Sequence, residues 1–217
     1  DSKAEYSNSN FVLLTFILER TFGKPYSQLL KTHITQPLGL ASTYMGGKID
    51  ISKNECNSYS YTGSWKIQPE TSMSVPLGAG AIVSTPGELV KFSDALFGYK
   101  LVKKENLELM KTIRDNFGLG LLQAPFYEKT GYGHNGGIDG FSSVLFHFAD
   151  GNISYALVSN GANFNTNDIS IAVLSAAYNM PYDLPEFSTY KLTSEDLDKY
   201  LGIYKSNDVP LAITITK

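Results

Sequence analysis

The spacing of apolar residues divides the chain into a mainly helical first half and a strand-rich second half. Apolar side chains that recur every three or four residues are typical of a helix with one buried face, whereas shorter runs rich in β-branched and aromatic residues are typical of strands. The predicted helices are residues 8–22, 25–36, 86–97, 103–113 and 168–180, and the predicted strands are residues 119–127, 131–136, 141–148 and 153–159.

Several of the predicted helices have recognisable ends. Thr85, Pro86 and Glu88 form the pattern of a capping box, in which a hydroxyl and a carboxylate satisfy the free N–H groups of the first turn. Gln36-Pro37 is expected to stop the second helix. In the first helix Asn8 or Ser9 is the expected N-cap and Gly23 the expected end. The buried stripe of that helix is expected to be Phe11, Leu14, Leu18 and Phe22.

The order of these elements predicts an α+β fold. Residues 1–187 are expected to form a helical subdomain followed by an antiparallel sheet with a packing helix, because strands close in sequence usually pair as antiparallel neighbours. After Pro181 the composition changes, and residues 188–217 are interpreted as a linker and the start of a C-terminal β extension. Residues 211–216 alternate as a strand that stops without a partner. The two ends predict an internal piece of a longer polypeptide.

Composition and charge exclude several classes of function. The chain has 217 residues, 42% of them hydrophobic and 18% charged, with a net charge of −3. It contains no basic run that would neutralise phosphates, which argues against nucleic-acid binding. Its longest apolar run, Phe11 to Leu18, is far shorter than the ~20 residues of a membrane-spanning helix. The three histidines and the single cysteine do not have the spacing of a metal site, so no metal site is expected.

The stretch Gly131–Gly137 around His134 is the strongest candidate for chemistry. Its glycines allow the backbone to approach another group closely, although a glycine-rich hairpin with a solvated histidine is an equally good interpretation of this stretch alone. Tyr6-Ser7-Asn8 is the second candidate, and packing of Tyr6 with capping by Asn8 is its simpler interpretation. The segment Tyr59–Trp65 either lines a cleft with aromatic side chains or forms a half-buried strand edge.

Together, Tyr6-Ser7-Asn8 and His134-Asn135-Gly136 resemble two of the three motifs of the penicillin-recognising serine hydrolases. The nearest branch is the class C β-lactamase and DD-peptidase group with its related esterases. Gln36–Leu40 and Phe117-Gly118-Leu119-Gly120 also resemble that group, over residues 1–187 in all. The resemblance implies a β-lactamase/transpeptidase-like fold, acyl transfer by a serine without cofactor or metal, and a periplasmic or secreted bacterial protein.

The resemblance also implies roles for individual residues. Tyr6 would carry a proton to or from the reacting group, and Asn8 would donate its amide to the substrate. His134 would replace the lysine that is usual at this place. Asn135 and Gly136 would hold the substrate against the strand, and the backbone N–H of Gly137 would stabilise the oxyanion.

The third motif, Ser-x-x-Lys, is expected to lie outside this chain because it precedes Tyr-x-Asn in the family and only five residues precede Tyr6. Ser188–Lys191 has the same pattern but follows the last core helix, and β-branched Thr189 disfavours a shared helix face. The sequence therefore predicts part of a serine hydrolase acting on a D-alanyl peptide, an ester or a β-lactam, inactive by itself. A second chain is one source of the missing segment.

The other interpretation is a non-catalytic module that binds cell-wall-like peptides or a partner protein. A Ser-x-x-Lys motif in a longer polypeptide would discriminate between the two. Because a histidine is mostly neutral at pH 7, His134 in place of lysine makes peptidase or esterase activity a better expectation than β-lactamase activity.

Overall fold

The computed structural model describes residues 5–184, 193–205 and 212–216. The chain separates into two compact units, residues 1–183 and residues 184–217. The boundary expected between residues 187 and 188 falls outside the described residues.

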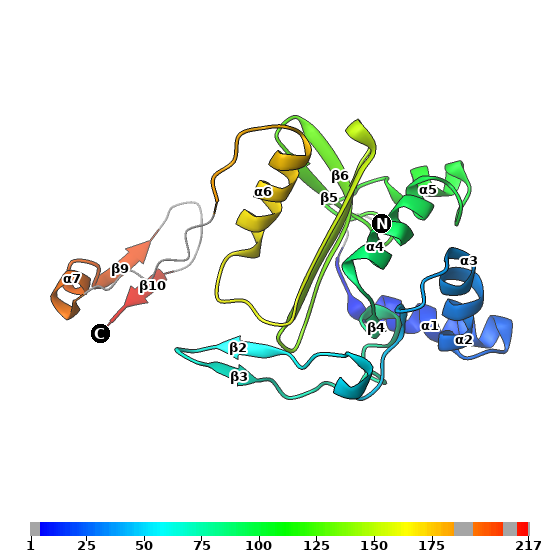
Figure 1. Ribbon diagram of the computed structural model, residues 1–217, viewed down its shortest axis with the longest axis horizontal. Helices are drawn as coiled ribbons and strands as arrows, with labels where there is room; N and C mark the ends of the chain where they lie inside the picture. The colour runs from blue at the N-terminus through cyan, green and yellow to red at the C-terminus, as the bar shows by residue number, and fades with distance from the viewer. Residues whose placement is uncertain (1–4, 185–192, 206–211, 217) are drawn as a thin grey trace. The chain divides into compact units, whose positions relative to one another are not determined.

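The first unit combines helices with antiparallel strands, which confirms the predicted α+β class (Figure 1). Its helices are α1 (Asn8–Phe22), α2 (Tyr26–Leu30), α3 (Gln36–Leu38), α4 (Pro86–Phe97), α5 (Lys104–Met110) and α6 (Thr166–Ala177), with short turns η1 (Lys31–Thr35), η2 (Ile51–Lys53), η3 (Leu77–Ala79) and η4 (Asp150–Asn152). Its strands are β1 (Tyr44–Met45), β2 (Tyr59–Tyr61), β3 (Trp65–Ile67), β4 (Ile82–Val83), β5 (Leu122–Phe126), β6 (Lys129–Ile138), β7 (Phe141–Phe148) and β8 (Ile153–Ser159).

The central sheet has the strand order β5-β6-β7-β8, and every neighbouring pair is antiparallel, as predicted for strands that follow one another in the sequence. The β5–β6 ladder ends where Leu122 pairs with Gly133. The β6–β7 ladder continues from there to Ile138. Among the described strands, residues 134–138 of β6 therefore pair on one side, and their other edge is open.

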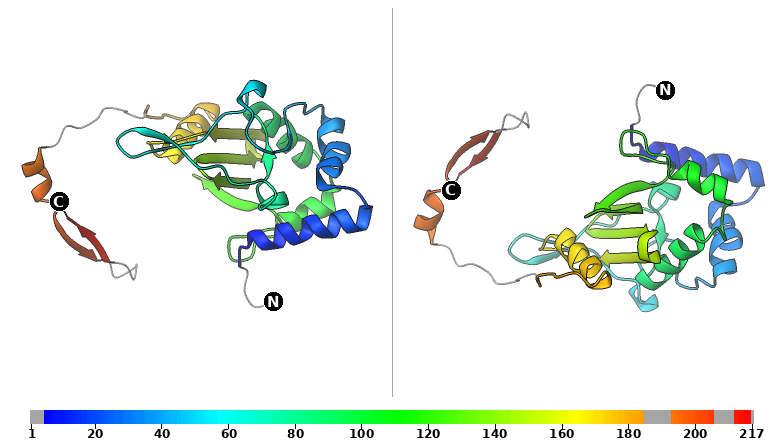
Figure 2. Two further views of the ribbon diagram at one scale, coloured as in Figure 1. Left: turned by 90° about the horizontal axis from the view of Figure 1, so that it is seen from below. Right: turned by 90° about the horizontal axis from the view of Figure 1, so that it is seen from above.

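Both faces of the central sheet are covered by helices (Figures 1 and 2). On the α6 face, the buried side chains of Phe126, Phe148, Tyr155 and Leu174 form one cluster. On the other face, α4 packs against β7 and β8, and the ring of Phe97 stacks on buried His147 at 4.4 Å between centroids. The alternation of side chains along β7 sends successive residues into these two layers.

Helix α1 begins and ends close to the predicted residues, but its N-cap is Ser7 rather than Asn8 or Ser9. Its end is a left-handed Gly23 with φ of 61°. The packed side of the helix centres on Thr15, which is 1% exposed and whose hydroxyl accepts the backbone N–H of Gly78 at 3.1 Å. A Cβ on Gly78 would lie 2.3 Å from that hydroxyl, so this glycine allows η3 to contact the helix.

The predicted buried stripe of α1 is wrong. Leu14, Leu18 and Phe22 are 49%, 38% and 52% exposed, because the described part of the chain packs against the Thr15 side of the helix. Figure 2 shows α1 as a long helix beside the sheet. Its exposed apolar side chains, called here the α1 apolar face, are Leu13, Leu14, Phe16, Ile17, Leu18 and Phe22.

Pro37 does not stop the second helical segment, contrary to the sequence prediction. The π-helical turn Lys31–Thr35 separates α2 from α3, and the helix ends at Leu38 before a left-handed Gly39. Proline lacks an N–H and its ring clashes with the carbonyl four residues earlier in a regular α-helix. A π-helical turn changes that spacing, so the chain can remain helical through Pro37.

Helix α4 has the predicted cap, with the Thr85 hydroxyl accepting the Glu88 N–H at 3.3 Å. The second half of the expected capping box is replaced by longer-range contacts. The Glu88 carboxylate accepts the backbone N–H of Ser42 at 3.0 Å and the hydroxyl of Thr43 at 2.6 Å. These contacts tie the start of α4 to the segment before β1.

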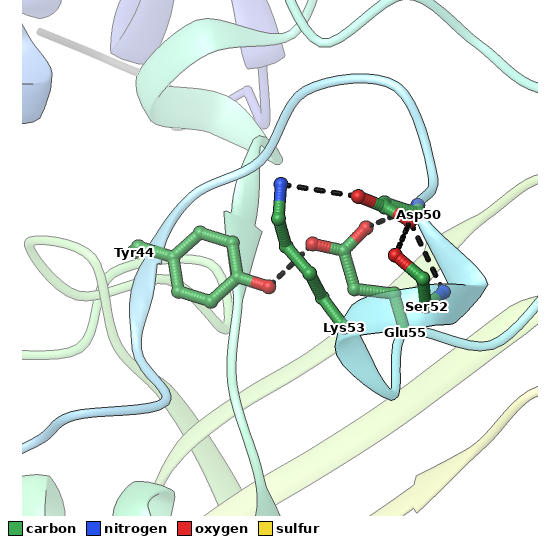
Figure 3. A network of polar contacts seen from close by, with 5 residues as sticks. All are labelled: Tyr44, Asp50, Ser52, Lys53 and Glu55. Atoms are coloured by element: carbon green, nitrogen blue, oxygen red, sulfur yellow. Dashed lines mark hydrogen bonds and ion pairs between the residues drawn. The ribbon is translucent and has the colours of Figure 1, made fainter.

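The segment after β1 is held by a local polar network (Figure 3). The Tyr44 hydroxyl donates to Glu55 Oε1 at 2.5 Å, and the Asp50 N–H donates to Glu55 Oε2 at 2.8 Å. Asp50 in turn accepts from Ser52 and pairs with Lys53 at 3.1 Å. The hydrogen bond to the carboxylate raises the pKa of Tyr44 to about 12 and lowers the pKa of Glu55. The network closes residues 44–55 into a compact loop.

The second unit contains α7 (Ser194–Asp198), β9 (Gly202–Lys205) and β10 (Ala212–Ile215). Thr193 and Asp196 form a capping box at the start of α7. The prediction of an unpartnered final strand is wrong, because β10 pairs with β9 in an antiparallel hairpin. Ser188–Lys191 lies outside the described residues. No helix in the described parts of either unit is long and apolar enough to span a membrane.

Candidate active site

The fold brings Tyr6 and His134 together although more than a hundred residues separate them in the sequence. Tyr6 lies just before α1, and His134 lies in the middle of β6 at the point where the β5 ladder has ended. The centroids of their rings are 5.9 Å apart and the ring planes are inclined by 35°. Two of the three side chains that the sequence assigns to catalysis are thus in direct contact.

The hydrogen bonding of His134 defines which of its nitrogens can accept a proton. Its Nδ1 lies in hydrogen-bond contact with the backbone carbonyl of Asn135. A carbonyl oxygen can only accept, so Nδ1 carries the proton of the neutral ring and Nε2 presents a lone pair. The half-buried imidazole is therefore arranged to accept a hydrogen bond through Nε2.

The alternation of side chains along β6 distributes the rest of the motif over two faces of the sheet. His134 and Gly136 share one face, and Asn135 and Gly137 share the other. Asn135, Gly136 and Gly137 are all exposed. The Asn135 side chain consequently does not point to the same face as the imidazole, and Asn135 contacts His134 through its carbonyl oxygen.

Asn8 is the first residue of α1, two positions after Tyr6, and it is exposed. The structure assigns the N-cap position to Ser7, which makes no side-chain capping bond. The simpler interpretation of Asn8 as the helix cap is therefore wrong.

Phe117 is a third aromatic residue at the site, and its sequence context does not predict a role for it. Its ring lies on Tyr6 with a centroid distance of 5.6 Å and an inclination of 30°. The signal in the sequence was the run Phe117–Gly120, which resembled the family without a stated function. A contact between residues so far apart in the sequence follows from tertiary structure.

The end of β6 is anchored by residues at the two ends of the β2–β3 hairpin. Asp139, in the turn after β6, accepts the N–H of Thr71 at 3.0 Å and its hydroxyl at 2.6 Å. The next residue, Gly140, donates its N–H to the Ser58 hydroxyl at 3.0 Å. A Cβ on Gly140 would lie 2.5 Å from the Tyr59 carbonyl, so glycine permits this approach. These contacts fix the strand just beyond Gly136 and Gly137.

The residue just after α5 places a positive charge on the His134 face of the sheet. Lys111 follows that helix, and its Nζ lies 5.4 Å from the ring centroid of Tyr132, which shares a face of β6 with His134. The same ammonium pairs with Glu108 at 2.9 Å. Among the described residues, no three His, Cys, Asp or Glu side chains are grouped as a metal site would need.

A model of the Beta-lactamase family matches residues 1–179, most of the first unit. This chain belongs to the beta-lactamase family. The chain is 26% identical to penicillin-binding protein 4* of Bacillus subtilis over 98% of this chain and 53% of that protein. It is 30% identical to the D-alanyl-D-alanine-carboxypeptidase/endopeptidase AmpH of Escherichia coli over 48% of this chain and 26% of AmpH.

Solved structures of the beta-lactamase family support the same fold. The D-amino acid amidase of Ochrobactrum anthropi SV3, complexed with L-phenylalanine amide, superposes with a TM-score of 0.71 and 27% identity, covering 81% of this chain and 59% of the amidase. The chain matches penicillin-binding protein 4* and the amidase over most of its own length, but it spans only about half the length of either relative.

Proposed function

We propose that this chain is part of a serine hydrolase that cleaves an amide or peptide bond through an acyl-enzyme. The nucleophilic serine and its lysine lie, in this proposal, in a segment outside the present chain. The observation that carries the proposal is the contact between Tyr6 and His134 at the open edge of β6. The family match and the names of the amidase and carboxypeptidase relatives support it.

In the first half of the reaction the serine oxygen bonds to the substrate carbonyl carbon while its proton passes to a neighbouring base. Backbone N–H groups, including that of Gly137, stabilise the oxyanion that develops. The carbon–nitrogen bond then breaks and the amine leaves with a proton from the Tyr6 hydroxyl, which regains a proton from the base that took it from the serine. Water repeats the sequence on the ester and releases the acid, so the serine is regenerated.

The other residues of the site bind and orient the substrate. The Asn8 amide donates to the substrate's acyl group, and Asn135 and Gly136 provide the strand along which the substrate lies. His134 accepts a hydrogen bond through Nε2, which is the role that its contact with the Asn135 carbonyl leaves open. None of these steps draws on a cofactor or metal ion.

The preferred substrate is an amide or peptide rather than a β-lactam. A β-lactam or a peptide with a free C-terminus presents a carboxylate that a fixed positive charge would pair with. A histidine at this position provides a weaker positive charge than a lysine would. An amidase and the endopeptidase activity named for AmpH fit this preference, since neither substrate needs a free carboxylate. The proposal also includes a periplasmic or secreted bacterial location.

The α1 apolar face supports the view that further polypeptide completes the domain. Several large apolar side chains on one helix are unusual on the surface of a monomer and mark a contact surface. In this proposal the rest of the family domain covers them, whether it comes from the same polypeptide or from a second chain.

Covalent labelling of the full-length protein tests the proposal. A fluorescent fluorophosphonate should label the protein, and Tyr6→Phe should lower turnover of a D-alanyl-D-alanine peptide by ~10²–10⁴-fold. His33→Gln serves as the matched control, because His33 contacts Phe22 and lies outside the site. Absence of labelling would refute the enzyme. Retained binding of the same peptide without labelling would instead support the non-catalytic binding module.

A further inference from the structure

We propose that Phe117 is a positioning residue that holds the Tyr6 phenol against His134. Its ring lies on Tyr6 at 5.6 Å between centroids, while His134 lies at 5.9 Å. Within the described residues these are the two aromatic side chains in contact with Tyr6. The effect of Phe117 on catalysis rests on the proposed function, whereas its packing against Tyr6 does not.

Tyr6 needs such support because its own surroundings constrain it weakly. The side chain is 50% exposed and precedes the first residue of α1. The helix therefore does not restrict its rotamer as it restricts those of its own residues. A ring packed on one of its sides removes rotamers that would turn the phenol ring away from the imidazole.

Phe117 can serve as support because its backbone is rigidly held. Phe117 and Arg114 exchange two backbone hydrogen bonds of 2.9 Å each. The next two residues continue the anchor, with Gly118 donating to the Leu121 carbonyl at 2.7 Å and Leu119 donating to the Met110 carbonyl at 3.0 Å. These bonds tie Phe117 to the end of α5 and to the approach to β5.

The two glycines of the Phe117–Gly120 run are required by this geometry. A Cβ on Gly118 would lie 2.2 Å from the Met110 carbonyl oxygen, which no side chain could tolerate without a backbone shift. Gly120 has φ of +73°, a conformation that favours glycine. The hydrogen-bonded run Phe117–Gly120, called here the bracket, thus holds its first residue, Phe117, in contact with Tyr6. This explains a conspicuous motif that the proposed reaction does not itself use.

Nuclear magnetic resonance on the 217-residue chain tests the positioning directly. The wild-type chain should show cross-relaxation between the ring protons of Tyr6 and His134, assigned with Tyr6→Phe and His134→Gln. Phe117→Leu should weaken these cross-peaks by more than half and shift the His134 ring resonances. Phe117→Tyr keeps an aromatic ring at the position, so it should retain the Tyr6–His134 cross-peaks and the wild-type His134 ring resonances.

The chain contains its own matched controls, because each of the other histidines has a separate aromatic partner. His147 stacks on Phe97 and His33 contacts Phe22. Their resonances should not move in Phe117→Leu, whereas Phe97→Leu should shift His147 and leave His134 unchanged. Loss of the ring resonances of all three histidines in Phe117→Leu would indicate unfolding. In that case the measurement is repeated with Phe117→Met, which keeps more of the side-chain volume. Undisturbed Tyr6–His134 cross-peaks in Phe117→Leu or Phe117→Met would overturn the proposal.

Turnover of the full-length protein provides the functional readout. Phe117→Leu should lower kcat by about tenfold or more with KM within about twofold, because displaced catalytic groups slow the chemical step rather than binding. Phe117→Tyr should recover most of kcat. If the full-length protein shows no labelling or turnover, the proposed function fails while the resonance experiment still decides the role of Phe117.

Discussion

His134 and His147 lie on the same face of the central sheet in different surroundings. The β6–β7 register pairs His134 with Leu145, and His147 lies two residues further along β7. His134 is half-buried next to Tyr6, whereas His147 is 5% exposed beneath Phe97. The Nδ1 of His147 contacts the Ser154 hydroxyl at 3.0 Å, and that hydroxyl donates to the Ser93 hydroxyl of α4 at 3.1 Å. The same residue type thus lies beside Tyr6 at the candidate site in one position and in the buried core in the other.

Burial of His147 predicts a loss of stability in mild acid. Desolvation lowers its pKa below the ordinary value of 6.5, with Asp94 opposing the shift and Lys111 adding to it. The unfolded chain then binds the proton more readily than the folded chain. Stability contributed by the neutral ring is fully present above about pH 6.5 and decreases as pH falls below that value towards the lowered pKa.

Urea unfolding at several pH values between 7.5 and 5 measures this effect, the range being chosen around an ordinary histidine pKa of ~6.5. His147→Gln should flatten the decrease in the free energy of unfolding below pH 6.5. His33→Gln is the matched control, because His33 is exposed, and it should leave the slope unchanged. An equal slope in wild type and His147→Gln would show that other groups cause the acid sensitivity.

At the scale of elements, two glycines that look equivalent in the sequence have opposite roles. Gly118 belongs to the bracket that carries Phe117, and an added Cβ would meet the Met110 carbonyl at 2.2 Å. Gly87 lies in the first turn of α4, where an added Cβ would have no neighbour within 4 Å. Close approach therefore requires glycine at one position, and a helix tolerates alanine at the other.

Alanine at these two positions should change stability in opposite directions. Gly118→Ala should lower the free energy of unfolding by about 1–3 kcal/mol, because the backbone must shift to accept the methyl group. Gly87→Ala should raise it by up to ~0.5–1 kcal/mol, because alanine loses less conformational entropy in a helix. Urea denaturation measures both. A stability of Gly118→Ala equal to wild type would contradict the rigid bracket.

At the scale of the whole molecule, the α1 apolar face predicts how the 217-residue chain behaves by itself. It should bind the dye ANS and associate with itself, since apolar surface of this kind is usually a contact surface. Leu13→Ser combined with Ile17→Ser should reduce both effects. Their side chains are each 58% exposed, so the free energy of unfolding of the isolated chain should change by less than about 0.5 kcal/mol.

Comparison with the full-length protein tests whether this face is covered there. If further polypeptide packs on α1, the same double substitution should destabilise the full-length protein by several kcal/mol, as for buried aliphatic side chains. Ile171→Ser on the exposed side of α6 is the control, with 42% exposure. Equal, small effects in both proteins would refute the covering proposal.

The isolated chain should also lack serine-hydrolase turnover. In the proposed function the activated serine lies outside this chain, so binding groups and one oxyanion donor would leave at most residual acceleration. Nitrocefin, a p-nitrophenyl ester and a D-alanyl-D-alanine peptide cover the three substrate classes. Turnover that Ser188→Ala abolishes would make Ser188 the nucleophile, and turnover that survives this change would show an unidentified one.

Local chemistry in the sequence was sufficient to predict most elements. The Thr85 cap, Gly23 as a left-handed helix end and the alternation along β6–β8 act between residues close in sequence. The α+β class followed, because adjacent antiparallel strands and amphipathic helices restrict how layers can form. The Tyr-x-Asn and His-x-Gly patterns likewise identified the two residues that the fold brings into contact.

Only the tertiary structure decided the features that depend on which distant segments meet. Periodicity shows that α1 has an apolar stripe, but burial depends on the partner surface, and the described chain packs against Thr15 instead. A proline predicts a helix stop locally, yet a π-helical turn before Pro37 allows the helix to continue. Phe117 looked like part of a glycine-rich run, and its contact with Tyr6 arises because hydrogen bonds to Met110 and Leu121 position that run beside the start of α1.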